Sequence, residues 1–182
     1  MGMAAPTFFT AEMVLALPAD GNRYETVHGE LLVTPSPREL HQRVVTRLVH
    51  ALASYLEEYP VGVVYASPAD ISWGPDILVQ PDVFVAARAE ARTGDWKRIR
   101  TLHLAIEVRS PSTGRADRFT KRRLYQEVGV PLYWAVDPDE RVAEVWTPGD
   151  ALPLVVRDAL VWAPPDAAAP FTLGLAHLLR PV

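Results

Sequence analysis

The segment over residues 38–59 constrains the fold most, because it carries the longest helical pattern in the sequence. At about 100° per residue, its apolar side chains fill one broad face and its polar side chains fill the opposite face. The apolar face contains Val44, Val45, Leu48, Val49, Leu52, Tyr55 and Leu56, and the polar face contains Arg43, Arg47, His50, Ser54 and Glu57. A helix with one apolar face has to bury it against another layer, so we expect a packed domain.

Short apolar runs typical of β-strands supply that other layer. They cover residues 61–66, 69–73, 77–86, 102–109, 132–136, 141–147 and 153–162. Thr10 is a suitable N-cap for a short helix over 11–17, and residues 23–34 are typical of a hairpin that turns at His28-Gly29. A second helix is predicted over about 116–128, and a last helical turn over 175–179. This order predicts a mixed α/β fold with a central β-sheet flanked by helices.

The length of 182 residues is sufficient for one domain with a real core. We expect a single domain over residues 1–182, with its core at about 23–140 and further strands in 141–182. The absence of cysteine excludes disulfides, thiolate chemistry and cysteine-ligated zinc. No apolar run approaches the roughly 20 residues of a membrane span. No Lys or Arg precedes Arg23, as a signal peptide would need, so we expect a cytoplasmic protein.

Charge is distributed unevenly along the chain. The net charge is −4, yet residues 88–123 contain 11 Lys or Arg against 4 Asp or Glu. From charge alone, a solvated basic face is the more common explanation. A clustered positive charge can nevertheless meet a phosphate backbone in an otherwise acidic chain. The residues in this region that could contact phosphates are Arg88, Arg92, Lys97, Arg98, Arg100, Arg115, Arg118 and Arg122.

Two acids lie in predicted strands that are otherwise apolar. Asp82 follows Pro81 within the run 77–86, although strand interiors disfavour both residue types. For Asp82 alone, a salt bridge or an edge position that faces water is the better explanation. Glu107 shares a strand face with Arg109, so an ion pair between them explains it as well as a functional site does.

Lys121 is a third anomaly. On the wheel of the predicted 116–128 helix it lies within the inward stripe, together with Leu124 and Tyr125. It could extend outward to solvent, or pair with Asp117 one turn earlier. The chain contains 16 Arg and only 2 Lys, so it supplies simple positive charge with Arg. An inward Lys therefore indicates a need for a compact ammonium group.

His41 and Glu30 are weaker candidates. His41 lies in the first turn of the 38–59 helix on its apolar face, where a hydrogen-bonded core histidine is the more common situation. Glu30 follows the hairpin turn and could bind a metal or simply face solvent, and we favour the second. The sequence has no glycine-rich phosphate loop, no Gly-x-Ser-x-Gly elbow and no pair of histidines at metal-ligand spacing.

In their order, these features resemble the PD-(D/E)XK nuclease superfamily, which has the restriction-endonuclease-like fold. More narrowly, they resemble a large bacterial restriction-endonuclease family whose members are mostly uncharacterised. The matching segments cover roughly residues 10–140: Tyr24-Glu25 with Gly29-Glu30, Pro35-Ser36, His41, Pro81-Asp82, Glu107-Val108 with Ser110-Pro111-Ser112, Asp117 with Lys121 and Tyr125, and Gly129-Val130-Pro131 with Tyr133-Trp134 and Asp137-Pro138. The resemblance implies a restriction-endonuclease-like domain.

The resemblance also implies a metal-dependent endonuclease that hydrolyses phosphodiester bonds in DNA. Asp82 and Glu107 would then hold Mg²⁺ or Mn²⁺, with Glu30 as a further acid and His41 as a further candidate. The superfamily has a Lys two residues after the Glu, where this chain has Arg109, and Lys121 matches the position to which the narrower family has moved that role. A homodimer is expected of an enzyme that cuts two strands. The alternative is a catalytically inactive nucleic-acid-binding or assembly module with the same fold.

Overall fold

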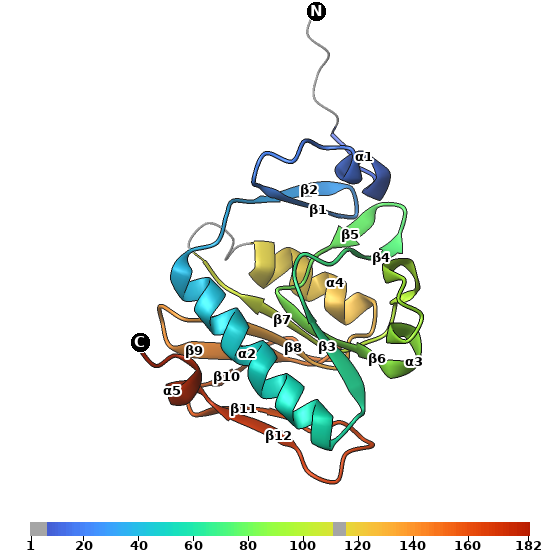
Figure 1. Ribbon diagram of the computed structural model, residues 1–182. Helices are drawn as coiled ribbons and strands as arrows, with labels where there is room; N and C mark the ends of the chain where they lie inside the picture. Colours follow the sequence, from blue (N-terminus) through green and yellow to red (C-terminus); the bar gives the residue numbers. More distant parts are fainter. Residues whose placement is uncertain (1–6, 111–115) are drawn as a thin grey trace, which may run out of the picture.

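The computed structural model describes residues 7–110 and 116–182, except for the side chains of 116–118. Its centre is a six-stranded sheet in the order β10-β9-β8-β7-β6-β3, in which β7 and β8 are parallel and the other neighbours antiparallel (Figure 1). These strands are β3 (Gly62–Ala66), β6 (Val83–Ala87), β7 (Leu102–Val108), β8 (Tyr133–Asp137), β9 (Val142–Trp146) and β10 (Leu154–Val156). The mixed α/β fold predicted from the sequence is confirmed.

Helix α2 (Glu39–Glu58) covers one face of this sheet. Its predicted apolar face is confirmed, since Val44, Leu48, Leu52 and Leu56 are buried and the remaining members pack at the margin. They contact inward side chains of the central strands, including Val83, Val85, Leu104 and Ile106. The hairpin β11 (Ala159–Trp162) and β12 (Phe171–Gly174), with helix α5 (Leu175–Leu178), completes this first core.

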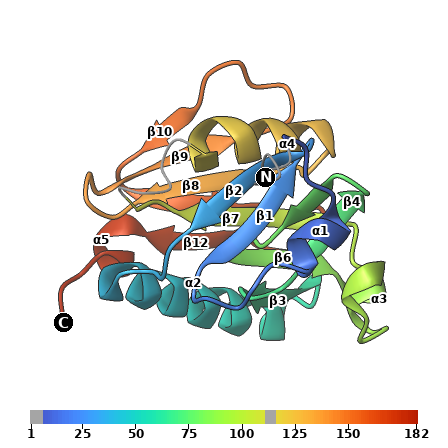
Figure 2. The same cartoon turned by 90° about the horizontal axis from the view of Figure 1, so that it is seen from above.

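The second predicted helix covers the opposite face, as the view from above shows (Figure 2). It begins as a π-helical segment, η2 (Ala116–Lys121), and continues as α4 (Arg122–Glu127). Leu124 and Tyr125 are buried against Tyr133 and Ala135 of β8. The central sheet therefore separates two cores, one under α2 and one under α4.

A second sheet of four strands lies above α4 in the order β2-β1-β5-β4 (Figure 1). Its strands are β1 (Arg23–Val27), β2 (Glu30–Thr34), β4 (Ile71–Gly74) and β5 (Ile77–Val79), and α1 (Ala11–Leu15) packs on it. The predicted hairpin turn is confirmed, because His28 and Gly29 have φ values of 50° and 80°, as a two-residue I′ turn requires. A side chain at Gly29 would also overlap the ring of Phe8.

Two predicted strands are each divided, which corrects the sequence prediction. Residues 77–86 form β5 and β6 in different sheets. The strand breaks because Pro81 cannot donate a ladder hydrogen bond and the backbone N–H of Gln80 donates to the Glu25 side chain. Residues 153–162 likewise form β10 and β11 in different sheets. Strand β12, helix α3 (Arg88–Ala91) and the 3-10 turn η1 (Trp96–Arg98) were not predicted, since such short elements carry little periodicity.

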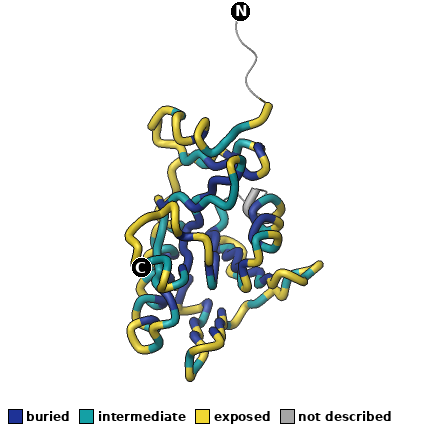
Figure 3. The backbone as a smooth tube through the Cα atoms, turned by 90° about the vertical axis from the view of Figure 1, so that its right-hand side faces the viewer, coloured by how far each residue is buried: buried dark blue, intermediate teal, exposed yellow. Residues whose placement is uncertain are grey.

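Buried residues occupy the middle of the molecule, and exposed residues follow its outer loops (Figure 3). The exceptions that concern function are polar. Six polar or charged residues are buried in the described chain: Glu25, Thr26, Asp82, Glu107, Lys121 and Glu144. Among the described helices, none combines the length and apolar character that would let it cross a bilayer.

Candidate active site

Asp82 lies at one end of the central sheet, directly before β6. The antiparallel register pairs Val83 with Ile106, so one further step brings Asp82 beside Glu107 at the end of β7. Asp82 is 2% exposed, and its Oδ2 accepts a hydrogen bond from the backbone N–H of Val108 at 2.8 Å. The break between β5 and β6 therefore leaves a buried acid at the end of the sheet, next to a second acid on the neighbouring strand.

Lys121 joins two buried acids from different elements. Its Nζ lies 2.9 Å from Glu107 Oε1 and 2.8 Å from Glu25 Oε1. Tyr125, four residues further along the same helix, donates its hydroxyl hydrogen to Glu107 Oε1 at 2.9 Å. The inward position predicted for Lys121 is confirmed, since its side chain is 1% exposed. One ammonium group thus bridges the central sheet and the β1–β2 hairpin.

Arg23 makes the corresponding link to Asp82. Its Nη1 donates to Asp82 Oδ1 at 2.8 Å and to Ser67 Oγ at 3.3 Å, while its Nε lies 3.6 Å from Glu25 Oε2. Glu25 is fully buried, and its Oε1 accepts a hydrogen bond from the backbone of Gln80 at 2.6 Å. The result is a continuous group of charges, which we call the Asp82 cluster: Arg23, Glu25, Asp82, Glu107 and Lys121.

Two members of the Asp82 cluster, Arg23 and Glu25, were not predicted as site residues. Glu25 belongs to the Tyr24-Glu25 segment of the family resemblance, but no role was assigned to it. The available signal was strand alternation, because Arg23 and Glu25 share the β1 face of Val27, which is buried. An acid on a face that also carries a buried Val requires a partner within the protein.

The charges of the cluster determine its protonation. Burial alone would raise the pKa of Asp82, but the hydrogen bond from His41 and the charges of Arg23 and Lys121 outweigh it and hold that pKa well below its ordinary value. Burial likewise opposes the charge of Arg23, yet Glu25 and Asp82 raise its pKa above the ordinary value. Burial, and then the charge of Glu107, raise the pKa of the Tyr125 hydroxyl, so Tyr125 remains a donor.

A cavity of about 740 Å³ opens beside Asp82. His41, from the first turn of α2, lines it and places Nε2 3.0 Å from Asp82 Oδ2. Arg23 and Asp82 line the same cavity, whereas Glu107 and Lys121 are buried behind them. His41 is thus a partner of Asp82 at the cavity wall, which differs from the sequence expectation of a core histidine.

Arg109 and Glu30 lie apart from the Asp82 cluster. The guanidinium of Arg109 is 2.6 Å from Glu144 on β9 and 3.8 Å from Asp137 at the end of β8, so the expected pair with Glu107 is replaced by acids of the next two strands. Glu30 is exposed beside the hairpin turn, at the opposite end of the β1–β2 ladder from Arg23. The structure therefore brings neither residue to Asp82.

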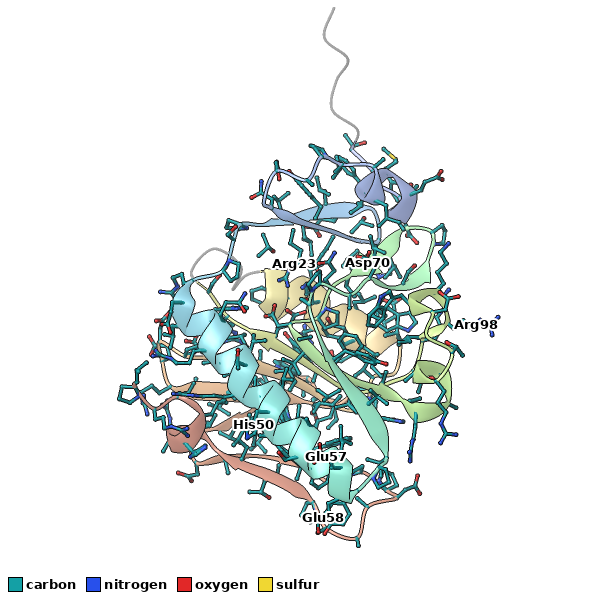
Figure 4. All side chains as sticks on the ribbon, viewed as in Figure 1. Arg23, His50, Glu57, Glu58, Asp70 and Arg98 are labelled. Carbon is teal, nitrogen blue, oxygen red and sulfur yellow. The ribbon has the colours of Figure 1, made fainter. Side chains whose placement is uncertain are left out.

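The basic region is divided by the fold. Arg88, Arg92, Lys97, Arg98 and Arg100 are exposed beyond the end of β6 that is opposite to Asp82. Arg98 accordingly lies at the right-hand edge of the molecule, away from Arg23 near its middle (Figure 4). Arg122 lies over the ring of Trp146, with 4.7 Å to its centroid. Some predictions fall outside the described residues or side chains. They are the phosphate contacts of Arg115 and Arg118, the ion pair of Lys121 with Asp117, and the family segment Pro111-Ser112.

The residues of the Asp82 cluster fit a hard divalent cation in their donor chemistry. Glu25, Asp82 and Glu107 offer carboxylate oxygens, and Glu25 Oε2 is buried without a hydrogen-bond partner. Among the described residues, no group of three or more His, Asp or Glu side chains is arranged to hold a metal by itself. Mg²⁺ is typically held by only one or two protein carboxylates, with other oxygens completing its shell. Arg23 covers Asp82 Oδ1, so a cation there would share or replace that contact.

Comparison with known proteins identifies a family and a similar solved structure. The family model "Uma2: Putative restriction endonuclease" matches residues 11–176, which is most of the chain. Among solved structures, a protein from Anabaena variabilis ATCC 29413, described as a putative nuclease belonging to DUF820, superimposes with a TM-score of 0.77. That match has 23% sequence identity and covers 94% of this chain and 97% of the other, so it supports the fold. No curated protein matches the chain.

Proposed function

This chain belongs to the Uma2 family, described as putative restriction endonucleases, and we propose that it is a metal-dependent nuclease that hydrolyses phosphodiester bonds in DNA. The metal is Mg²⁺ or Mn²⁺, and Asp82 and Glu107 hold it. Lys121 supplies the positive charge of the catalytic centre, His41 positions Asp82, and Arg23 binds the phosphate.

One observation carries this proposal. Acids from separate parts of the chain are buried together at the end of the central sheet, and Asp82 among them lines an open cavity. Burying several carboxylates is costly, so a fold that needed only stability would be served as well by apolar side chains there. An acid such as Asp82, with a strongly lowered pKa at the wall of a cavity, is instead typical of functional sites.

Each residue has a role in the proposed reaction. A divalent ion at Asp82 and Glu107 would supply Lewis acidity toward the phosphate. Lys121, 2.9 Å from Glu107, keeps an ammonium group where negative charge develops on the phosphate. Tyr125 fixes the orientation of the Glu107 carboxylate, and His41 and the Val108 N–H fix that of Asp82. Arg23, when released from Asp82, is placed to bind a phosphate oxygen at the cavity wall.

Lys121 is favoured over Arg109 for the catalytic cation. Lys121 contacts Glu107 directly, whereas Arg109 is held by Glu144 and Asp137. An ammonium group can also shift its pKa and exchange a proton when buried, which a guanidinium does not do. The role of the superfamily Lys is therefore assigned to the helix and not to the strand.

A cleavage assay tests the function directly. Wild-type protein and the Asp82→Asn variant are incubated with Mn²⁺ and a mixture of single-stranded, duplex and mismatched DNA. Asp158→Asn, an exposed acid at the start of the β11–β12 hairpin, is the matched control. We expect cleavage by wild type and the control and at least a hundredfold slower cleavage by Asp82→Asn. DNA binding without cleavage by any of the three proteins would instead indicate the inactive module.

A further inference from the structure

We propose that the cavity beside Asp82 receives one unstacked nucleotide, so that the substrate is single-stranded or locally unpaired DNA. This inference rests on the proposed nuclease function and adds to it the class of substrate. It is carried by the size of the cavity, the composition of its wall and its position relative to the acids.

The size of the cavity fits a single nucleotide. Its volume of about 740 Å³ is within the range of sites that enclose a small organic molecule. A sphere of that volume is about 11 Å across, which is no wider than a single groove of B-DNA at ~12 Å. The cavity can therefore hold one nucleotide but not the full width of a duplex.

Part of the cavity wall is apolar. Aliphatic and proline side chains from three loops form much of it: Leu17, Pro18, Pro35, Pro37 and Pro68. Tyr24 adds an aromatic ring, held in place by a hydrogen bond of 2.7 Å from its hydroxyl to Asp20. Such a surface offers a charged phosphate no hydrogen bond or ion pair. An unstacked base, in contrast, is stabilised by stacking on aromatic and apolar side chains.

Polar groups are interleaved with that apolar wall. Gln42 on α2 and Asn22 before β1 present amide groups, and Arg38 at the start of α2 is half exposed and paired with Asp139 at 2.6 Å. Amide side chains can both donate to and accept from the edge of a base. The arrangement thus offers stacking surface, hydrogen-bonding groups for a base and a cation for its phosphate within one cavity.

The relative positions of these parts fix the direction of the substrate. Asp82 is buried and Arg23 and His41 are partly buried, whereas the prolines that line the same cavity are exposed, so the charged groups lie deeper than the prolines. A phosphate at the charged groups therefore leaves its base in contact with the apolar wall. Paired, stacked bases in a duplex cannot adopt this arrangement without unstacking, which costs a few kcal/mol.

The first test measures binding without hydrolysis. Fluorescence anisotropy of a labelled ten-nucleotide oligothymidylate, in EDTA, is compared for wild type, Tyr24→Ala and Gln42→Ala, which remove the aromatic ring and one amide group from the cavity wall. Ser54→Ala, exposed on α2 outside the cavity, is the matched control. We expect affinity to fall at least tenfold in both cavity variants and to be unchanged in the control. Equal affinity in all four proteins would overturn the proposal.

The second test measures substrate class. Wild type with Mn²⁺ is given one sequence as a single strand, as a duplex with a central mismatch and as a fully paired duplex. We expect the single strand to be cut at least tenfold faster than the paired duplex, with the mismatched duplex in between. Faster cleavage of the paired duplex would refute the substrate class and leave the nuclease function standing. If no DNA is cut while the binding result holds, the nuclease function fails and the cavity still binds the nucleotide.

Discussion

Two groups of charged residues lie on the α4 face of the central sheet, and they differ in what surrounds them. The Asp82 cluster takes its residues from β1, the segment before β6, β7 and η2, and it reaches a cavity. The second group, which we call the Arg109 cluster, contains Arg109, Asp137 and Glu144. Among the described residues that line the cavity, none belongs to the Arg109 cluster.

The comparison separates a structural ion pair from a candidate catalytic group. Arg109 finds its acids on β8, the strand next to its own, and on β9, the strand after that, and Trp146 donates a hydrogen bond to Glu144 at 3.2 Å. The sheet register alone therefore accounts for the Arg109 cluster. The Asp82 cluster requires the hairpin, the sheet and the helix to converge, and it places a carboxylate at a cavity wall. Buried charge by itself thus does not identify a functional site. A cavity through which a substrate can reach the buried charge does.

The largest expected effect is on stability. Lys121→Met leaves Glu25 and Glu107 buried without their shared cation, and breaking a buried ion pair typically costs about 3–5 kcal/mol. Arg109→Met leaves Glu144 with its hydrogen bond from Trp146, so we expect a smaller loss of about 1.5–3 kcal/mol. Urea unfolding of both variants measures this difference. Equal losses would remove the distinction between the two clusters.

The next effect is on the chemical step. Lys121→Ala should slow single-turnover cleavage at saturating DNA by at least tenfold, about 1.4 kcal/mol of barrier. Arg109→Ala should leave that rate within about threefold of wild type, because its charge is engaged by Glu144. Both are measured at a temperature where circular dichroism shows the variants folded. A reversed order of the two rates would return the catalytic role to Arg109.

A smaller effect concerns Arg23 as a competitor of the metal. Arg23 holds Asp82 Oδ1 at 2.8 Å, so Arg23→Gln should increase the affinity for Mn²⁺ by about fivefold, at the lower end of coupling between neighbouring sites. Arg38→Gln changes an exposed arginine of the same cavity and is the control. Isothermal calorimetry provides both affinities. Weaker Mn²⁺ binding in Arg23→Gln would mean that Arg23 supports the metal.

The smallest effect is on the salt dependence of DNA binding. Arg38 lines the cavity, whereas Arg98 does not line it and lies at the right-hand edge of the molecule in Figure 4. Arg38→Gln should reduce the log–log slope of single-strand affinity against salt by about 0.7, the contribution of one phosphate contact. Arg98→Gln should leave the slope unchanged. A reduced slope in Arg98→Gln and an unchanged slope in Arg38→Gln would instead support the 88–123 region as the DNA-binding surface.

Sequence patterns predicted the parts of the site that are anomalous within their own element. Asp82 and Glu107 are acids in apolar runs, and Lys121 is a cation in an apolar stripe, so local periodicity identified all three. The wheel placed Lys121 correctly although η2 is π-helical, because only one turn separates it from Tyr125. Whether these residues act in catalysis stays a prediction.

The sequence did not predict what depends on contacts between distant segments. Glu25 looks ordinary in a hairpin, and its burial arises because Thr26 of β1 pairs with Leu78 of β5, some fifty residues away. The preference of Arg109 for Glu144 depends on β9 lying next to β8. The division of 77–86 followed from Pro81, which was recognised as a poor strand residue but not as a strand end. Local pattern thus identifies unusual residues, and the tertiary fold determines their partners.

The central claim is that Asp82 and Glu107 share one divalent ion. Calorimetric titration of Mn²⁺ into wild type and Asp82→Asn, in the same buffer and without DNA, tests it most directly. The account predicts one ion per chain in wild type and at least tenfold weaker binding in Asp82→Asn, because one of the two carboxylates is lost. Equal affinity in the two proteins, or no binding to either, would contradict it.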